Sequence, residues 1–382
     1  MKPKTLLFGS AIAFAATSAY AADASAVPEP EPVGYVRVCD AYGMGFFYIP
    51  GTETCVRISG YIWYQIGATT DDGLVVDADG NVIGGDTPNY QGFLPGGWNK
   101  STRPRVNIDA RSETEWGQLR AFVRFQADWG NELPGAFADG PVSTDQAWLS
   151  LGGLRMGYTE SAWAETIFDV TNGGSFSDGQ LWYGDQERHL IQYNFGADRG
   201  VFGVVSLEDD ALEGRGFVPD AVGLIGYQAE WGAVWGRLAY DESYNKFDDS
   251  GFGAELGAQI NLARIGGEIR LMGWYADADH MYGTQSSYAG ISGGSGNAEW
   301  SVLAAYNQVF TPKFSASTGF QYFNDFYEAL SDVKTGLNGY SADLSFVWLP
   351  VDDFEVRAEA NYDKVDTFDG SVAAFLRFTR FF

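Results

Sequence analysis

Seven arginines occupy the polar positions of segments in which apolar and polar residues alternate. Alternate residues of a β-strand point to the same face, so these arginines are predicted to share one face of a sheet. Guanidinium groups stay charged at any physiological pH and bind anions and water through fixed N–H donors. The chemistry that such a face offers is therefore electrostatic. The seven residues are Arg57, Arg105, Arg111, Arg120, Arg124, Arg155 and Arg377.

A second charged feature is the segment 159–187, which is rich in carboxylates. Its acidic residues are Glu160, Glu165, Asp169, Asp178, Asp185 and Glu187. Residues 161–169 are compatible with a short helical turn, and the glycine pair at 173 and 174 would end it. Taken by themselves, these carboxylates have a simple alternative interpretation as the solvated charges of a long loop.

Residues for covalent or acid–base catalysis are scarce. The two histidines, His189 and His280, are expected to be surface or interior polar residues rather than bases. Residues 290–294 match G-x-S-x-G but lie in a Gly/Ser-rich loop rather than on a strand-to-helix elbow. Two cysteines and two histidines leave no zinc cluster, and residues 77–81 fail the spacing of a calcium loop. We therefore predict a protein that is not an enzyme and needs no metal or cofactor.

The overall charge narrows the choice of partners. Lys and Arg number 24 against 50 Asp and Glu, which gives a net charge of -26. Such an acidic chain cannot neutralise a phosphate backbone, so no nucleic-acid partner is expected. Aromatic residues make up 16% of the chain, which is too many for an acidic disordered protein. The 49 glycines and the many Tyr, Phe and Trp residues indicate a β-rich fold.

The N-terminus has the features of a secretory signal. Two lysines precede an apolar stretch at 6–16, and Ala-Tyr-Ala at 19–21 is a cleavage site, so residues 1–21 are predicted to be removed. Residues 22–54 are predicted to form a periplasmic Pro/Glu tail followed by a segment closed by a disulfide. In an oxidising compartment, Cys39 and Cys55 are expected to form that bond.

The rest of the chain, residues 55–382, is predicted to form sixteen β-strands. The connections between them alternate between short turns and long loops, and no apolar run is long enough for a transmembrane helix. The predicted strands are 55–69, 103–115, 117–128, 142–152, 154–160, 187–197, 200–208, 220–230, 232–242, 251–262, 264–277, 298–310, 313–324, 339–349, 353–366 and 370–382.

An even number of strands with alternating short and long connections is typical of an outer-membrane β-barrel. Lipid cannot satisfy backbone N–H and C=O groups, so the antiparallel sheet must close, with its apolar face outward. At sixteen strands the interior is predicted to be a water channel lined by polar residues, without a packed core. A β-sandwich or propeller is the alternative, although no repeat of 40–50 residues supports a propeller. Aromatic residues near strand ends fit interface girdles: Tyr193, Phe195, Tyr240, Tyr275, Tyr306, Tyr322, Trp348 and Tyr362.

Two segments carry a more specific resemblance. The opening YVRVCDAYGMGFFYIPGTETCVRISGYIWYQIG (35–67) and the ending AFLRFTRFF (374–382) resemble those of the alphaproteobacterial general porin family of rhizobia and brucellae. The signal, the tail, the strand count and the total length agree with that family over essentially the whole chain. The resemblance implies a homotrimer of sixteen-stranded barrels in the outer membrane, each with its third loop folded into the pore.

This resemblance gives the acidic segment a role. If the third loop folds inward, Glu160, Glu165 and Asp169 are expected to face the seven arginines named above, which we call the arginine wall. Opposed charges across a narrow opening set up a transverse field, which orders water and hinders apolar solutes while small hydrophilic solutes pass. The predicted function is passive diffusion of ions and small hydrophilic solutes. The negative net charge favours a mild preference for cations.

Two rival functions remain open at this stage. A substrate-specific channel would have a ladder of inward aromatic residues, of which Trp63, Trp148 and Trp274 are candidates. A secreted β-rich hydrolase would dissolve without detergent. Many other carboxylates fall in predicted outer loops, where they are expected to be solvated or to bridge divalent cations to lipopolysaccharide. These are Asp71, Asp72, Asp77, Asp79, Asp86, Asp209, Asp210, Glu213, Asp248, Asp249, Asp277 and Asp279.

Overall fold

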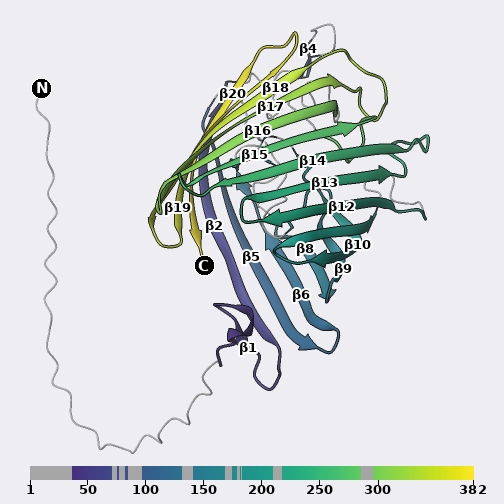
Figure 1. Ribbon diagram of the computed structural model, residues 1–382. Helices are drawn as coiled ribbons and strands as arrows, with labels where there is room; N and C mark the ends of the chain where they lie inside the picture. Colours follow the sequence, from purple (N-terminus) through teal and green to yellow (C-terminus); the bar gives the residue numbers. More distant parts are fainter. Residues whose placement is uncertain are drawn as a thin grey trace, which may run out of the picture.

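The computed structural model of the chain describes residues 37–70, 75–76, 82–84, 97–130, 141–167, 174–178, 181, 183–209, 217–284 and 296–382 (Figure 1). The predicted signal at 1–21, the G-x-S-x-G match and Asp169 lie outside these residues, as do seven of the outer-loop acids. Those seven are Asp71, Asp72, Asp77, Asp79, Asp86, Asp210 and Glu213. Within the described residues, no helix is long and apolar enough to cross a membrane.

The strands form a closed antiparallel barrel. Of eighteen strands in the main sheet, β1 (Phe47–Tyr48) and β7 (Trp129–Gly130) are two-residue additions, and the other sixteen make the barrel. The last strand pairs with the first over Tyr61↔Phe381 to Thr69↔Ala373, which closes the sheet. The barrel strands are β2 (Cys55–Thr69), β5 (Asn99–Thr114), β6 (Gly117–Gln126), β8 (Ser143–Leu151), β9 (Leu154–Glu160), β10 (Glu187–Gly196), β11 (Gly200–Glu208), β12 (Asp220–Ala229), β13 (Gly232–Asp241), β14 (Gly251–Leu262), β15 (Gly267–Ala276), β16 (Ala298–Thr311), β17 (Phe314–Phe326), β18 (Gly339–Val351), β19 (Phe354–Val365) and β20 (Ser371–Phe381).

The predicted strands agree closely with the observed ones. Four of the sixteen have the predicted bounds, and most of the others differ by one or two residues at an end. The largest difference is at β5, which begins at Asn99 rather than at residue 103. This added stretch, from Asn99 to Thr102, pairs with β2, and Ser101 and Thr102 also pair with β7. A separate hairpin of β3 (Val75–Val76) and β4 (Val82–Gly84) lies in the first long connection.

As predicted, apolar side chains point outward from the barrel, which is the reverse of their placement in a soluble protein. Apolar residues such as Ile58, Ile225 and Leu256 are exposed on the outer surface, as expected for a barrel that lies in lipid. Their neighbours along each strand point into the interior. The eight aromatic residues predicted for the girdles all lie at outward positions.

The interior is not the fully water-filled channel that the strand count predicted. A buried apolar cluster fills the side formed by β11–β16, because part of a long loop packs onto these strands. The strands contribute Phe202, Val204, Val222, Leu224, Ala233, Trp235, Ala239, Met272, Trp274, Leu303 and Ala305. The expectation of an interior without a core is therefore wrong for the β11–β16 side of the barrel, and Trp274 belongs to this core.

The segment before β2 packs at the end of the barrel that carries the short turns (Figure 1). It contains η1 (Asp40–Tyr42) and β1, which pairs with the start of β2. Cys39 and Cys55 form the predicted disulfide, with their Cα atoms 6.0 Å apart. Phe46 is buried beside this bond, with the guanidinium carbon of Arg57 4.8 Å from its ring centre. The disulfide-closed segment therefore supports the first arginine of the wall.

Candidate functional site

The described residues of the connection between β9 and β10, 161–167, 174–178, 181 and 183–186, lie inside the barrel, and we call them the inner loop. It starts with one helical turn, in which the Glu165 amide donates to the Ser161 carbonyl at 2.9 Å. The Ser161 hydroxyl donates to Glu208 of β11 at 2.6 Å, and the Ala162 amide donates to the same carboxylate at 2.9 Å. Trp163 then enters the apolar cluster and is fully buried. The predicted helical turn is therefore present at the start of this loop.

The middle of the inner loop, residues 174–177, contacts the barrel strands β15 and β18. Arg270 of β15 donates to the carbonyl oxygens of Gly174 and Ser175, at 2.6 and 3.1 Å. The Ser177 hydroxyl donates to Asp343 of β18 at 2.5 Å, and Ser175 contacts the same carboxylate.

Asp178 ties the inner loop to the strands that close the barrel. Its amide donates to Glu359 of β19 at 2.6 Å, and its carboxylate forms an ion pair with Arg377 of β20. The described parts of the inner loop therefore contact inward side chains of strands from β11 to β20.

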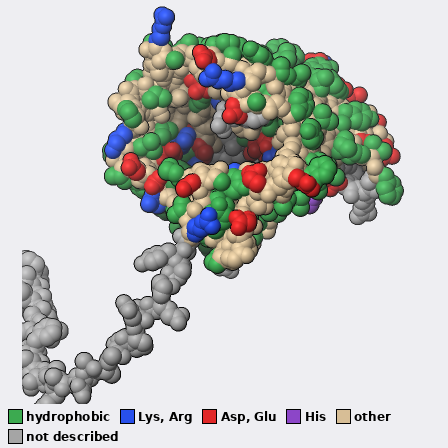
Figure 2. All heavy atoms as spheres, turned by 60° about the horizontal axis from the view of Figure 1, so that its bottom comes forward, with side chains coloured by type: hydrophobic (Ala, Val, Ile, Leu, Met, Phe, Trp, Pro, Cys, Tyr) green, Lys and Arg blue, Asp and Glu red, His purple; other side chains and the backbone are tan. Residues whose placement is uncertain are grey.

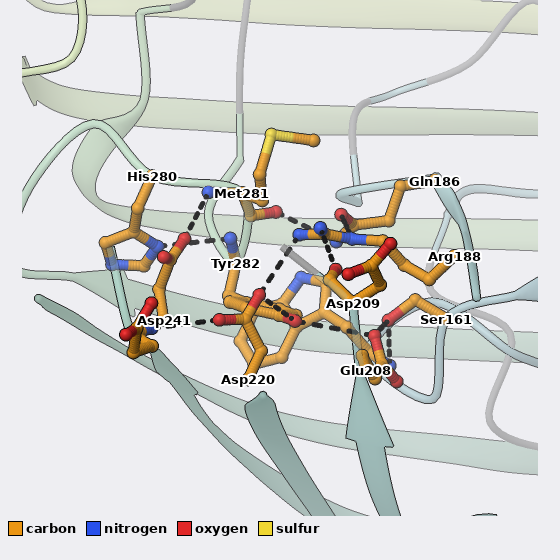
Figure 3. Close-up of polar contacts among 12 residues, drawn as sticks. Ser161, Gln186, Arg188, Glu208, Asp209, Asp220, Asp241, His280, Met281 and Tyr282 are labelled. Atoms are coloured by element: carbon orange, nitrogen blue, oxygen red, sulfur yellow. Dashed lines mark hydrogen bonds and ion pairs between the residues drawn. The ribbon is translucent and has the colours of Figure 1, made fainter. Parts of the chain in front are cut away.

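A buried polar network holds both ends of the inner loop together (Figure 3). The Ser161 amide donates to the Gln186 carbonyl at 2.9 Å. Arg188 of β10 donates to the Gln186 side chain at 2.9 Å and lies 3.5 Å from Asp220 of β12. The Tyr282 hydroxyl donates to Asp220 at 2.9 Å and contacts Glu208 at 3.4 Å. One network therefore fixes the start and the end of the loop to three neighbouring strands.

Tyr282 belongs to a second segment that folds inward, residues 277–284, which we call the brace loop. Its ring meets that of Trp163 edge-on with centres 5.9 Å apart, and the Gln186 side chain donates to the Met281 carbonyl at 2.9 Å. Asp279 in this loop is fully buried and accepts from the amides of Asn297 and Leu330, at 2.9 and 2.8 Å. The expectation that outer-loop acids are solvated is therefore wrong for Asp279.

The predicted arginines do line one side of the interior, on β2, β5, β6, β9 and β20. Asp109 of β5, only 1% exposed, lies among three of them. It accepts from Arg111 at 2.6 Å and from Arg120 at 2.8 Å, and lies 3.6 Å from Arg57. This carboxylate is absent from the predicted site, although its position on β5 has the same parity as Arg105 and Arg111.

A second carboxylate, Asp145 on β8, is shared by Arg105 at 3.8 Å and Arg124 at 3.3 Å. Aromatic rings lie beneath other arginines of this wall. The guanidinium carbon of Arg377 is 4.8 Å from the Trp63 ring centre, and that of Arg120 is 4.7 Å from the Trp148 ring centre. The two tryptophans point inward as predicted, but they are covered by arginines rather than arranged as a bare ladder.

Arg103 completes the wall and was not predicted. It forms an ion pair with Asp128 at 2.6 Å, and its guanidinium carbon is 5.3 Å from the Trp63 ring centre. The same parity that identified Arg105 on β5 also places Arg103 on the inward face. The observed wall is therefore a mixture of arginines, carboxylates and indoles rather than a purely basic surface.

The inner loop meets this wall at Glu165. The Glu165 carboxylate forms an ion pair with Arg155 of β9 and accepts from the Gln192 side chain at 3.0 Å. Glu160, at the end of β9, is close enough to Glu165, Asp185 and Glu187 to interact with them electrostatically. Of the three predicted acidic residues, Glu165 directly contacts the arginines, Glu160 joins an acidic group beside it, and Asp169 lies outside the described residues.

The loop carboxylates differ in their affinity for protons. Burial acts to raise the pKa of Asp178, but the charges of Arg377 and Arg357 outweigh it and lower this pKa below its usual value. Burial, together with the charge of Asp145, raises the pKa of Asp185. As the pH falls, Asp178 therefore keeps its negative charge to a lower pH than an ordinary aspartate, whereas Asp185 is protonated at a higher pH.

The barrel has a hollow at one of its ends (Figure 2). Figure 2 shows the molecule turned so that the end bearing the short turns comes forward, with a hollow whose rim carries acidic and basic side chains. The apolar cluster fills the β11–β16 side of the interior, away from the arginines of β2, β5, β6, β9 and β20. A passage with charges of both signs on facing surfaces suits polar solutes and ions.

The model of one protein family, the porin subfamily, matches residues 23–375 of the chain. The chain belongs to this family. The porin Omp2b of Brucella neotomae is 32% identical over 384 residues, which cover 95% of this chain and 93% of that protein. The porin Omp2b of Brucella suis biovar 1 is 34% identical over 317 residues, covering 77% of this chain and 80% of that protein. These relatives are channels rather than enzymes, and the predicted alphaproteobacterial family is confirmed.

Solved structures agree on the fold of this porin. The outer membrane channel DcaP of Acinetobacter baumannii superposes with a TM-score of 0.62 at 16% identity, covering 88% of this chain and 99% of that one. The anion-selective porin from Comamonas acidovorans gives a TM-score of 0.55 at 10% identity, covering 86% of this chain and all of that one. The porin is thus a multi-pass β-barrel of the outer membrane, as predicted.

Proposed function

We propose that this porin is a general diffusion channel whose narrowest part lies between the inner loop and the arginine wall. Glu160, Glu165 and Asp169 form its acidic side. The basic side consists of the seven predicted arginines together with Arg103. The observation that carries this proposal is the contact of Glu165 with Arg155, because it brings opposite charges together where the loop approaches the wall. Ions and small hydrophilic solutes cross in the ordered water beside this contact.

A mild preference for cations follows from the local balance of charge. Eight wall arginines share five carboxylates: Asp109, Asp128, Asp145, Glu165 and Asp178. Among the described residues, Asp185 and Glu187 form no ion pair, so they offset part of the excess of arginines. With the narrow part near neutrality, the negative charge of the rest of the chain attracts cations to both mouths.

The test is the reversal potential of the refolded porin in a planar bilayer under a salt gradient. Replacing Glu165→Gln together with Asp169→Asn removes two negative charges from the acidic side. The reversal potential should therefore shift in the direction of greater anion permeability. The surface pair Arg199 and Glu230, 3.1 Å apart and largely exposed, supplies the control variant Glu230→Gln. An unchanged reversal potential in the double variant would exclude Glu165 and Asp169 from the narrow part.

Solute specificity offers a second test. In a substrate-specific channel, one solute would block or saturate the current at low concentration. The inward tryptophans Trp63 and Trp148 lie under arginine side chains, and Trp274 lies in the apolar cluster. These positions favour general diffusion, because a sugar could not stack on rings that are already covered. A current that saturates with one solute alone would support the specific channel.

We further propose that the porin is a homotrimer that uses the outer surface of β2–β9 as its contact. On these strands the outward aromatic residues are Tyr64, Phe125, Trp129 and Tyr158. Such residues are abundant on β10–β20, where a girdle in contact with lipid needs them. On that side they are Tyr193, Phe195, Tyr227, Tyr240, Phe252, Tyr275, Trp300, Tyr306, Phe314, Phe320, Tyr322, Tyr340, Phe346, Trp348, Phe354, Tyr362 and Phe378.

A matched pair of variants tests this surface. Ala121 on β6 and Ala304 on β16 are both exposed and outward. Ala121→Trp should convert the trimer to monomers in detergent, as measured by sedimentation, and Ala304→Trp should not. A wild-type protein that sediments as a monomer would contradict the proposal.

A further inference from the structure

Behind the inner loop lies a buried ion pair that does not reach the water of the pore. Arg237 of β13 donates to both oxygens of Glu255 on β14, at 2.7 and 2.9 Å. Both side chains are 0% exposed. An ion pair taken fully out of water gains little stability over an apolar pair of the same size. Stability alone therefore does not explain why an ion pair occupies this position.

Two tryptophans fix the carboxylate of this pair. The indole N–H of Trp235 donates to Glu255 at 2.6 Å, and that of Trp274 donates to its other oxygen at 3.0 Å. The Trp235 ring lies directly over Gly257 of β14, where any Cβ would fall 2.1 Å from the ring. The backbone can approach the indole this closely only at glycine. Glu255 is therefore held by two indoles, of which at least one cannot shift toward the wall.

The guanidinium group of Arg237 has a second partner, which belongs to the inner loop. Its Nη2 donates to the backbone carbonyl of Glu165 at 2.6 Å. The side chain of the same residue points the other way, to Arg155 and Gln192. Since the carbonyl and the carboxylate share one Cα, holding the carbonyl sets where the carboxylate can lie. A line of contacts thus runs from Trp235 and Trp274 through Glu255 and Arg237 to the acidic side of the pore.

We propose that Arg237, oriented by Glu255 and the two indoles, is the positioning residue for the Glu165 carboxylate in the pore. This inference rests on the proposed function, in which Glu165 contributes to ion selection. Arg237 itself touches neither solute nor pore water and acts through the loop backbone. Without it, Glu165 keeps its charge but loses its fixed place opposite Arg155.

The test removes the pair as a unit. Arg237→Met alone would leave Glu255 charged and buried, so the variant is Arg237→Met with Glu255→Gln, whose amide oxygen can still accept from an indole N–H. A nitroxide spin label attached at Glu165→Cys reports local order, and its spectrum should change from immobile to mobile in this background. The matched control is a label at Ser177→Cys, because Asp343 rather than Arg237 holds that part of the loop.

Three outcomes of the label experiment and one of a gel assay are decisive. Mobility that rises at position 165 and not at 177 supports positioning by Arg237. An unchanged spectrum at 165 overturns it. Equal mobility at both positions also overturns it, since the pair would then act as general support for the loop. A variant that loses the heat-dependent gel shift of a folded barrel likewise assigns the pair to the stability of the fold.

The reversal potential tests whether the positioning of Glu165 affects ion selectivity. In the wild-type background Glu165→Gln should change the cation-to-anion permeability ratio, and in the double-variant background this change should fall to half or less. An equal effect in both backgrounds overturns positioning. If Glu165→Gln has no effect in the wild type, the proposed role of Glu165 fails, while the label at 165 still decides whether Arg237 positions it.

Discussion

At the scale of single side chains, the charge of the pore wall depends on which carboxylates the arginines share. Seven wall arginines could be predicted because each lies at an inward position of a strand with clear alternation. Asp109 and Asp145 were missed because parity shows only that two residues share a face. It does not show that one carboxylate lies between three guanidinium groups, as Asp109 does.

Asp109→Asn should both destabilise the barrel and shift the pore toward anions. It removes the shared partner of Arg57, Arg111 and Arg120 and leaves three positive charges together. Because these arginines are partly exposed to pore water, we expect a loss of about 1–3 kcal/mol. Urea-dependent loss of the heat-resistant gel band measures stability, and the reversal potential measures selectivity. Asp353→Asn, which affects an exposed pair with Arg380, is the control and should change neither.

The pH dependence of selectivity should separate two loop carboxylates. Because the pKa of Asp185 is raised by burial and by Asp145, this group loses its negative charge first as the pH falls from neutrality. The effect of Asp185→Asn on the reversal potential should therefore disappear before the pH reaches the ordinary aspartate range. The pKa of Asp178 is lowered, so the effect of Asp178→Asn should persist to lower pH. Two effects that fade together would contradict this order.

At the scale of elements, the sequence contains the strands but not the path of the inner loop. Each strand carries its own period-2 pattern, so its presence can be predicted locally. The loop is held by contacts such as Ser177 with Asp343 and Asp178 with Glu359, which are 166 and 181 residues apart. No local pattern contains such pairings, and the inward path was predicted only from the family resemblance. The apolar cluster was missed for the same reason.

Cys39→Ser with Cys55→Ser should loosen the segment before β2 and leave a conducting pore. The disulfide links residues 16 apart, and closing a loop of this length contributes about 3 kcal/mol in the chain-entropy model. The sixteen barrel strands keep their pairing in the variant. Limited proteolysis should cleave the segment faster, while single-channel steps persist. Complete loss of current from correctly folded protein would show that the segment also shapes the pore.

At the scale of the whole molecule, the barrel has two unlike halves. Its β11–β16 side is a packed apolar core beneath the inner loop, and its β2–β9 side is a charged wall facing water. The closed sheet pairs the backbone N–H and C=O groups that lipid cannot satisfy, and the inner loop determines how much of the interior stays open. The passage is consequently bounded by the charged wall and the inner loop, and substitutions of apolar-core residues other than Trp235 and Trp274 should affect stability more than selectivity.

The preference for cations should have a part that depends on salt and a part that does not. Exposed acids such as Asp248 and Asp249 are screened at 1 M salt, where the Debye length is about 3 Å, and act over about 30 Å at 0.01 M. Glu165 lies in contact with Arg155, where salt screens little. Cation preference should therefore rise as salt is lowered, by the same factor in wild type and in Glu165→Gln. The offset between the two proteins should persist at 1 M. Reversal potentials at constant salt ratio and falling absolute concentration measure both parts, and an offset that vanishes at 1 M would assign the selectivity to the mouths alone.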